Sequence, residues 1–123
     1  MQITMEQLVA EARARIREVS VSELRESPGP DTVLIDVREP DEHAAGHIPG
    51  SLNIPRGVLE AEVAPVPEMG GETAPALADK DRPICLYCRT GGRSALAADA
   101  LQNMGFTRVT SLAGGFVAWQ ADR

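Results

Sequence analysis

One short segment of the chain brings together a thiol, two guanidinium groups and two adjacent glycines. It reads Cys88-Arg89-Thr90-Gly91-Gly92-Arg93-Ser94. The apolar run 83–87 before it predicts a buried strand, and the alanine-rich stretch 94–104 after it predicts a helix that Gly105 ends. In open α/β sheets, ligands bind outside the carboxyl ends of the strands. Cys88 therefore stands where a reactive group is expected.

The residues around Cys88 favour its thiolate form, which is the reactive form of cysteine. The start of a helix offers unpaired N–H groups and a partial positive charge. Arg89 and Arg93 add full positive charges. Gly91 and Gly92 permit backbone angles that let successive N–H groups turn toward one anion. A cysteine that only packs in the core would not need these charges, so the segment predicts an anion-binding cradle with a nucleophilic thiol at its base.

Cys85 and Cys88 form a C-x-x-C pair, but neither a metal site nor a redox site is expected from it. Zinc usually takes four ligands, and the chain has only two cysteines and two histidines. Cys85 falls within the predicted strand, where residues three apart point to opposite faces. We therefore expect Cys85 to be a packing thiol, with a resolving role as a minor hypothesis, and we expect no metal ion.

Three stretches resemble the rhodanese family, in the order that the family shows. The first comprises 34–42 and 46–55 (LIDVREPDE and GHIPGSLNIP), the second is the loop 88–94, and the third is 114–119 (GGFVAW). The resemblance spans about residues 19 to 120. It implies an α/β fold, rhodanese-like, with a five-stranded, mostly parallel sheet flanked by helices on both faces. It divides the chain into an N-terminal helical extension, 1–18, and a rhodanese-like domain, 19–123.

The resemblance also implies an activity, that of a thiosulfate sulfurtransferase. Cys88 would take a sulfane sulfur from a small anionic donor such as thiosulfate, hold it as a persulfide, and pass it to a thiol, cyanide or protein acceptor. The segment Arg89 to Arg93 would supply backbone N–H groups to the sulfur, its arginines would attract the donor, and Ser94 would add a hydroxyl. No metal or organic cofactor is implied.

Two alternatives stay open. The chain could be a sulfur-relay or binding module whose partner is a protein, because that function would use the same Cys88. A cysteine-dependent phosphatase or arsenate reductase is the second alternative. Phosphatases place five residues between cysteine and arginine, whereas four separate Cys88 from Arg93. A smaller ring suits one sulfur better than the oxygens of a phosphate.

Three polar residues of the first stretch, Asp36, Arg38 and His47, are expected to support the site. Asp36 follows a predicted buried strand and is expected to be a structural acceptor that supports the loop. Arg38 and Glu42 are four apart and are expected to form an ion pair. His47 is expected to hold its own loop by hydrogen bonds rather than to act in acid–base catalysis.

Composition narrows the function classes. A net charge of −6 disfavours nucleic-acid binding, which needs a basic face. No apolar stretch approaches the roughly 20 residues of a membrane span, and no secretory signal is evident in 1–18. With only two cysteines, both expected to be reduced, we expect a cytoplasmic protein without nucleic-acid or membrane partners.

The remaining patterns predict alternating strands and helices. Helices are expected at 4–18, 22–26, 39–45, 94–104 and after Gly115; strands are expected at 19–21, 32–37, 51–54, 83–87 and 108–111. A capping box is predicted between Thr4 and Gln7. The Pro- and Gly-rich stretch 61–79 is expected to be a long surface loop. The alternation argues for a largely parallel sheet.

Overall fold

The computed structural model describes residues 2–26, 31–63 and 77–122. Its framework is a sheet of five short strands in the order β1-β5-β4-β2-β3, in which every pair of neighbours is parallel. The strands are β1 (Arg17–Val19), β2 (Val33–Asp36), β3 (Leu52–Asn53), β4 (Ile84–Tyr87) and β5 (Val109–Leu112). This confirms the predicted α/β fold with its five-stranded sheet. All carboxyl ends of the strands therefore lie along one edge, where Cys88 follows β4.

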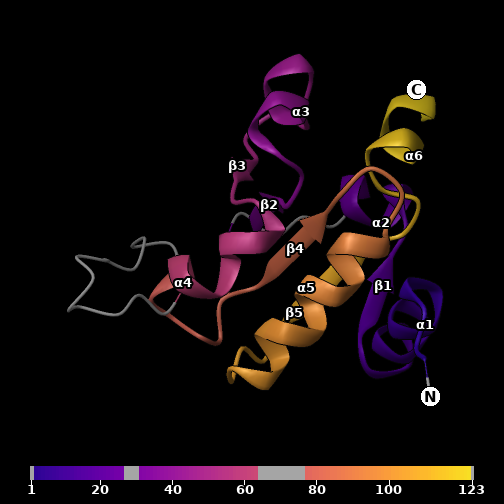
Figure 1. Ribbon diagram of the computed structural model, residues 1–123. Helices are drawn as coiled ribbons and strands as arrows, with labels where there is room; N and C mark the ends of the chain where they lie inside the picture. Colours follow the sequence, from indigo (N-terminus) through magenta and orange to yellow (C-terminus); the bar gives the residue numbers. More distant parts are fainter. Residues whose placement is uncertain (1, 27–30, 64–76, 123) are drawn as a thin grey trace.

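Helices cover both faces of the sheet (Figure 1). They are α1 (Met5–Arg15), α2 (Val21–Glu26), α3 (Pro40–Ala45), α4 (Leu59–Val63), α5 (Gly92–Asn103) and α6 (Gly115–Ala121), with a 3-10 turn, η1 (Arg56–Val58), before α4. Figure 1 shows α5 lying across the sheet beside β4 and β5, with α1 next to α5. Helix α5 is the element that follows the Cys88 loop.

The two faces of the sheet have separate apolar cores, which explains why β4 is apolar along its whole length and β2 is apolar up to Asp36. On one face, Ile35 and Leu86 pack with Leu101 of α5. On the other face, Tyr87 and Cys85 of β4 pack with residues of α2 and α6. Successive residues of one strand thus enter opposite cores, as the two-residue period of a strand requires.

The N-terminal helix was predicted to run to Glu18, but it ends at Arg15. The chain turns extended because 17–19 pairs with 110–112 of β5 as the edge strand. The short strand therefore lies two residues before its expected place at 19–21. The predicted capping box is present: Gln7 N donates to Thr4 Oγ1 at 3.1 Å, and Thr4 N donates to Gln7 Oε1 at 2.7 Å. The division of the chain at residue 18 remains a prediction.

The stretch 61–79 was expected to be a loop, and its beginning is helical instead. Helix α4 includes 61–63, because Leu59 and Val63 lie one turn apart and are both buried in the core on the α5 side. Leu77 enters the same core. The rest of that prediction, 64–76, lies outside the described residues.

Candidate active site

The Cys88 sulfur lies at the centre of a tight loop between β4 and α5. Gly91 N donates to Cys88 Sγ at 3.1 Å, and Ser94 N donates to it at 3.4 Å. The Ser94 hydroxyl is 3.6 Å from the same sulfur. Residues 89–93 were expected to donate backbone N–H groups to this sulfur. Of these, Gly91 donates to it at 3.1 Å, and Ser94 N is a further backbone donor at 3.4 Å. The sulfur is almost completely shielded, with Cys88 only 1% exposed.

The loop closes in this way because Gly91 has a left-handed backbone, with φ of 112°. This conformation is readily accessible only to glycine. It directs the N–H of Gly91 back to the sulfur three residues earlier and starts α5 at Gly92. The amino end of a twelve-residue helix thus faces Cys88, where its unpaired N–H groups favour a negative charge.

These contacts decide the protonation of the thiol. Burial alone would raise the pKa of Cys88, because it penalises the charged form. The hydrogen bonds from Ser94, Gly91 and Thr90 outweigh that penalty, so the pKa of Cys88 is lowered below its ordinary value. Cys85 has no such set of donors, and burial raises its pKa to about 11. Of the two thiols, only Cys88 is activated.

Behind the loop, the start of α6 holds two of its carbonyl groups. Phe116 N donates to Cys88 O at 2.8 Å, and Val117 N donates to Arg89 O at 3.1 Å. The close approach depends on Gly115, because a Cβ there would lie 2.5 Å from Cys88 O. The stretch 114–119 was noted only for its resemblance, and its contact with the Cys88 loop gives it a structural role.

The two arginines of the loop have different surroundings. Arg93 makes a bidentate ion pair with Glu42 of α3, with Nη1 at 2.8 Å and Nη2 at 3.1 Å from the carboxylate oxygens. Arg93 holds the pKa of Glu42 down to about 2. Arg89 is exposed, and within the described part of the chain it has no ion pair. Arg89 is therefore the guanidinium that is free to meet an incoming anion.

The expected Arg38–Glu42 ion pair does not form. Arg38 turns back to Asp36 instead, with its Nε 2.9 Å from Oδ1 and its Nη2 2.7 Å from Oδ2. The Arg38 N–H also donates to Asp36 at 3.0 Å. Sequence spacing suggested the wrong partner, since Arg38 precedes α3, so the four-residue helical repeat does not apply to it.

The pair of Asp36 and Arg38 supports the loop that follows α3. Burial would raise the pKa of Asp36, but its bonds from Arg38 and His43 lower it below its ordinary value. Arg38 Nη2 also donates to Gly46 O at 2.7 Å. Asp36 is thus a structural acceptor, as expected, although the bonds just described tie it to the loop around Gly46 rather than directly to Cys88.

His47 makes the kind of local bond that was expected of it, since its Nδ1 lies 2.9 Å from His43 O. Its ring also stacks on that of His43, with centroids 3.8 Å apart. In turn, His43 Nδ1 lies 2.9 Å from Asp36 Oδ2. The two histidines and Asp36 form one unit that orders the turn after α3.

Ser111 of β5 was not among the predicted site residues. Ser111 Oγ is 2.8 Å from Ser94 Oγ, and both side chains are fully buried. Only the register of the sheet brings them together, because β5 pairs with β4 so that Ser111 lies beside Leu86. The signal in the sequence was a polar residue at a position of β5 that faces the same side as the apolar Val109.

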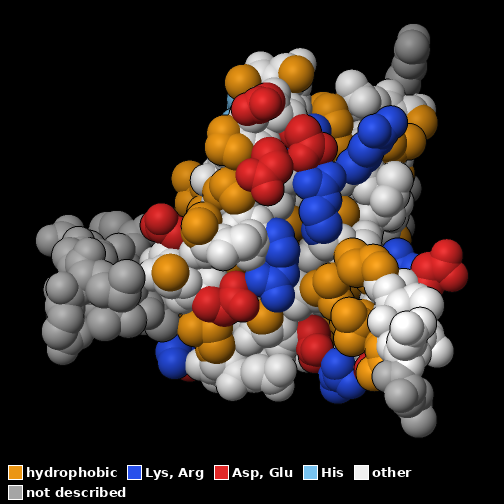
Figure 2. Space-filling model, viewed as in Figure 1, with side chains coloured by type: hydrophobic (Ala, Val, Ile, Leu, Met, Phe, Trp, Pro, Cys, Tyr) orange, Lys and Arg blue, Asp and Glu red, His pale blue; other side chains and the backbone are white. Residues whose placement is uncertain are grey.

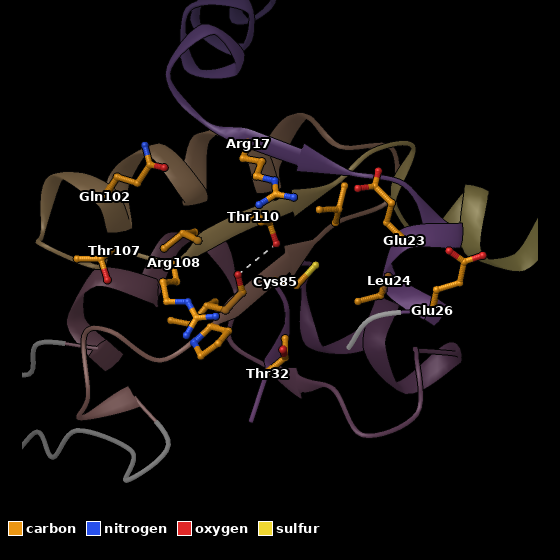
Figure 3. A pocket seen from close by; sticks show the side chains of 14 residues that line it. Arg17, Glu23, Leu24, Glu26, Thr32, Cys85, Gln102, Thr107, Arg108 and Thr110 are labelled. Atoms are coloured by element: carbon orange, nitrogen blue, oxygen red, sulfur yellow. Dashed lines mark hydrogen bonds between the residues drawn. The ribbon is translucent and has the colours of Figure 1, made fainter. Parts of the chain in front are cut away.

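A groove of about 790 Å³ lies on the other face of the sheet and does not include Cys88. Figure 3 shows Cys85 and Thr110 in this groove, with Arg17 and Arg108 at its rim. The thiol of Cys85 is the unactivated one, so we do not place the chemistry there. Cys85 and Cys88 enter opposite cores, as predicted from their spacing.

Figure 2 shows basic and acidic side chains interspersed on the face drawn. Among the described residues, Arg15 pairs with Asp99 and Arg56 pairs with Glu60. Within the described residues, no group of three or more histidine, cysteine, aspartate or glutamate residues is arranged to hold a metal ion, and no helix is long and apolar enough to cross a membrane.

The sequence model of the Rhodanese-like domain matches residues 20–122. The chain belongs to the rhodanese family. It is similar to a sulfurtransferase of Allochromatium vinosum, with 36% identity over 89 residues that cover 72% of each chain. It is also similar to the thiosulfate sulfurtransferase GlpE of Pseudoalteromonas translucida, with 36% identity over 74% of this chain and 75% of the relative.

One solved structure resembles nearly the whole rhodanese chain, including its N-terminal region. It is that of a protein of unknown function from Rhodopseudomonas palustris, called a possible tyrosine phosphatase. The two share 32% identity and a TM-score of 0.84, and the match covers 98% of this chain and 92% of the other. The family model begins at residue 20, so α1 lies before the residues that it matches, whereas the match to this solved structure extends over 98% of the chain.

Proposed function

We propose that this protein is a sulfurtransferase that carries a sulfane sulfur on Cys88. The observation that supports this most directly is the ring of donors around one sulfur atom: two backbone N–H groups at 3.1 and 3.4 Å and a hydroxyl at 3.6 Å. Such donors stabilise an anionic sulfur. They serve equally for the thiolate of Cys88 and for the terminal sulfur of a persulfide.

The reaction divides into two halves. The Cys88 thiolate attacks the outer sulfur of the donor; a new S–S bond forms, the bond to the leaving group breaks, and the leaving group departs with its electron pair. With thiosulfate the leaving group is sulfite. A nucleophilic acceptor then attacks the outer sulfur of the persulfide and restores the thiolate. No net oxidation of the protein occurs, so the chain's own residues account for both halves.

Thiosulfate or a similar small anion is the donor that we favour. Arg89 is exposed beside Cys88 and has no ion pair among the described residues, so it can bind a sulfonate-like group through two N–H bonds. Arg93 contributes through its charge, because Glu42 occupies its hydrogen-bonding edge. The relative called a thiosulfate sulfurtransferase supports the same donor class.

The acceptor is a thiol, cyanide or a protein. A protein acceptor would make the chain a sulfur-relay module, with the same persulfide on Cys88. The two versions differ in the second half-reaction alone. Comparing the rate of persulfide discharge to cyanide with that to a small thiol such as glutathione tests whether small acceptors suffice.

A phosphatase remains the second candidate, because a similar solved structure is called a possible tyrosine phosphatase. The geometry of this chain favours sulfur. The donors of the loop converge on one atom, and Arg93 already uses two guanidinium nitrogens to hold Glu42. A phosphate would need several oxygens to be bound at once, and the arginine best placed for this is occupied.

The test is to supply thiosulfate and cyanide, follow thiocyanate, and record the intact mass after thiosulfate alone. We expect turnover and one added sulfur in the wild type, and neither in Cys88→Ser. Cys85→Ser is the matched control and should retain both. Hydrolysis of p-nitrophenyl phosphate, measured in parallel, would favour the phosphatase if it depended on Cys88 while no sulfur was added.

A further inference from the structure

Ser111 has a buried hydroxyl with a single partner among the described residues. Its Oγ lies 2.8 Å from Ser94 Oγ, and the side chain is completely buried. A buried hydroxyl without a partner is costly, so this bond must form. Ser111 is on the same face of β5 as Val109, which enters the apolar core. An apolar residue would be the ordinary choice at this position.

The hydrogens of the two hydroxyls can be assigned by counting. Each hydroxyl has one hydrogen to donate. Ser111 finds an acceptor only in Ser94 Oγ, so it is satisfied as a donor when it points its hydrogen there. Ser94 then has its own hydrogen left, with Gly91 O at 3.3 Å and Cys88 Sγ at 3.6 Å as its two acceptors. An anionic sulfur attracts that hydrogen more strongly than a neutral carbonyl does.

When Cys88 is a neutral thiol, it can donate to Ser94 Oγ, which has two lone pairs and accepts from Ser111 as well, and the Ser94 hydrogen turns to Gly91 O. A hydroxyl that accepts a hydrogen bond donates a stronger one, and the gain is larger toward a negative sulfur than toward a neutral carbonyl. The bond from Ser111 therefore favours the state in which the sulfur is negative. Hydrogen bonds in a chain also polarise one another, which strengthens the bond at the far end.

We propose that Ser111 is a positioning residue for the sulfur anion: by donating to Ser94, it directs the Ser94 hydroxyl toward Cys88 Sγ. The proposal deepens the proposed function, because the same relay would serve a thiolate and a persulfide. Ser111 does not touch the sulfur itself. It acts through Ser94 alone, from β5, the strand that pairs with β4, and its effect is on the charge of the sulfur.

The charged groups near this sulfur come from the loop and from the helices α1, α3 and α5. Arg13 of α1 pairs with Glu18, and its Nη2 lies 3.3 Å from the position that a Cβ of Gly91 would take. Arg93 of α5 interacts with the charge of Cys88, and Glu42 of α3 holds Arg93 in place. Arg89 belongs to the loop itself. Cys85 points into the opposite core. None of these groups is hydrogen-bonded to Ser111, so a substitution there leaves the surrounding ion pair unchanged.

The test measures the rate at which iodoacetamide alkylates Cys88 as a function of pH, in the full chain. This rate follows the thiolate fraction and needs no sulfur donor. We expect Ser111→Ala to shift the profile to higher pH and to slow alkylation near neutral pH by about two- to fivefold, as expected for losing a cooperative contribution to one hydrogen bond. Thr110→Val removes a hydroxyl from the opposite face of the same strand and should leave the profile unchanged.

Ser111→Thr and Ser111→Val separate the hydroxyl from packing, because the two side chains are nearly equal in shape. Both variants stress the core alike, yet only Ser111→Thr keeps the donor. We expect the threonine variant to keep a profile closer to that of the wild type than the valine variant does. Equal profiles for these two variants, or a wild-type profile in Ser111→Ala, would overturn the proposal.

The outcome can be distinguished from a failure of the proposed function. A shifted alkylation profile without any sulfur transfer from thiosulfate would support the relay and contradict the donor. Normal sulfur transfer with an unshifted profile in Ser111→Ala would contradict the relay and leave the sulfurtransferase in place.

Discussion

Substitution of Gly115 has a testable consequence, because this residue packs α6 against the backbone of the Cys88 loop. Its φ is 58°, in the left-handed region. A Cβ at this position would lie 2.5 Å from Cys88 O and 2.6 Å from both the carbonyl carbon and the oxygen of Arg89. All three are backbone atoms, which cannot move away as the end of a side chain can. Gly115→Ala should therefore displace the loop that holds the sulfur.

The magnitude follows from two separate costs. Placing alanine in a left-handed conformation costs about 1–2 kcal/mol, and the more restricted unfolded chain offsets about 0.4–1 kcal/mol of this. Forcing an extra carbon into packed backbone adds about 1–3 kcal/mol. We therefore expect Gly115→Ala to lower the free energy of unfolding by about 2–4 kcal/mol. For a chain of this size, each kcal/mol corresponds to about 3–6 °C in Tm.

Gly50 offers a matched control. Its φ of 84° is also left-handed, but a Cβ there would meet nothing within 4 Å. Gly50→Ala should therefore show the conformational cost alone, about 1 kcal/mol or less. Urea unfolding of both variants, with the alkylation rate of Cys88, separates strain from steric displacement.

The loop geometry makes a second distinction between the two glycine variants. Gly115→Ala should slow the alkylation of Cys88 in the folded protein, because the carbonyl of Cys88 can no longer keep its 2.8 Å bond from Phe116 N. Gly50→Ala should not change it. Equal stability losses and equal alkylation rates in both variants would refute the steric reasoning.

Three further outcomes follow from the site. Glu42→Gln releases Arg93, so we expect the KM for thiosulfate to fall about two- to fivefold at low salt and the gain to shrink as salt screens the freed charge; an unchanged KM would mean that Arg93 does not attract the donor. The pKa values of Asp36 and Glu42 are both lowered, that of Glu42 to about 2. The two carboxylates therefore stabilise the fold above their unfolded pKa values near 4, and this stabilisation is lost as the pH falls through the folded pKa values. When Tm is measured against pH, Asp36→Asn should lose less Tm in acid than the wild type does. Cys85, with a pKa raised to about 11, should resist iodoacetamide at pH 8 while Cys88 reacts, as peptide mapping would show.

The buried strands of the sheet could be predicted from the sequence, because their apolar patterns reflect their burial on both faces. Runs such as 32–37 and 83–87 are nearly continuous in apolar residues, a pattern typical of a strand covered on both faces. The edge strand β1 was placed two residues late, because an exposed three-residue strand has no apolar pattern of its own. Its position is decided by pairing with β5, a contact that spans about 90 residues of sequence.

In the site, the local features were predictable and the partners were not. The glycine pair and the helix start are encoded within seven residues, so the ring around Cys88 could be predicted. The partner of Arg93 could not be, since Glu42 lies 51 residues away and meets it only when α3 and α5 are both in place. The partner of Arg38 was also mispredicted. Glu42 lies four residues after Arg38 and was the expected partner, but Arg38 binds the buried carboxylate of Asp36, two residues before it.

The pairing of Arg93 with Glu42 bears on how one loop can hold an anion and still release it. In the proposed reaction, two free loop arginines would attract a sulfite leaving group as strongly as they attract the donor, and slow departure of sulfite would then limit turnover. The structure leaves Arg89 at the surface and neutralises much of Arg93 with a carboxylate whose pKa is held near 2. The charge that stabilises the sulfur then comes mainly from fixed N–H dipoles at 3.1 and 3.4 Å, which act on the sulfur atom and not on the departing group. The N–H groups therefore stabilise the sulfur bound to Cys88 more than they stabilise the donor or the leaving group.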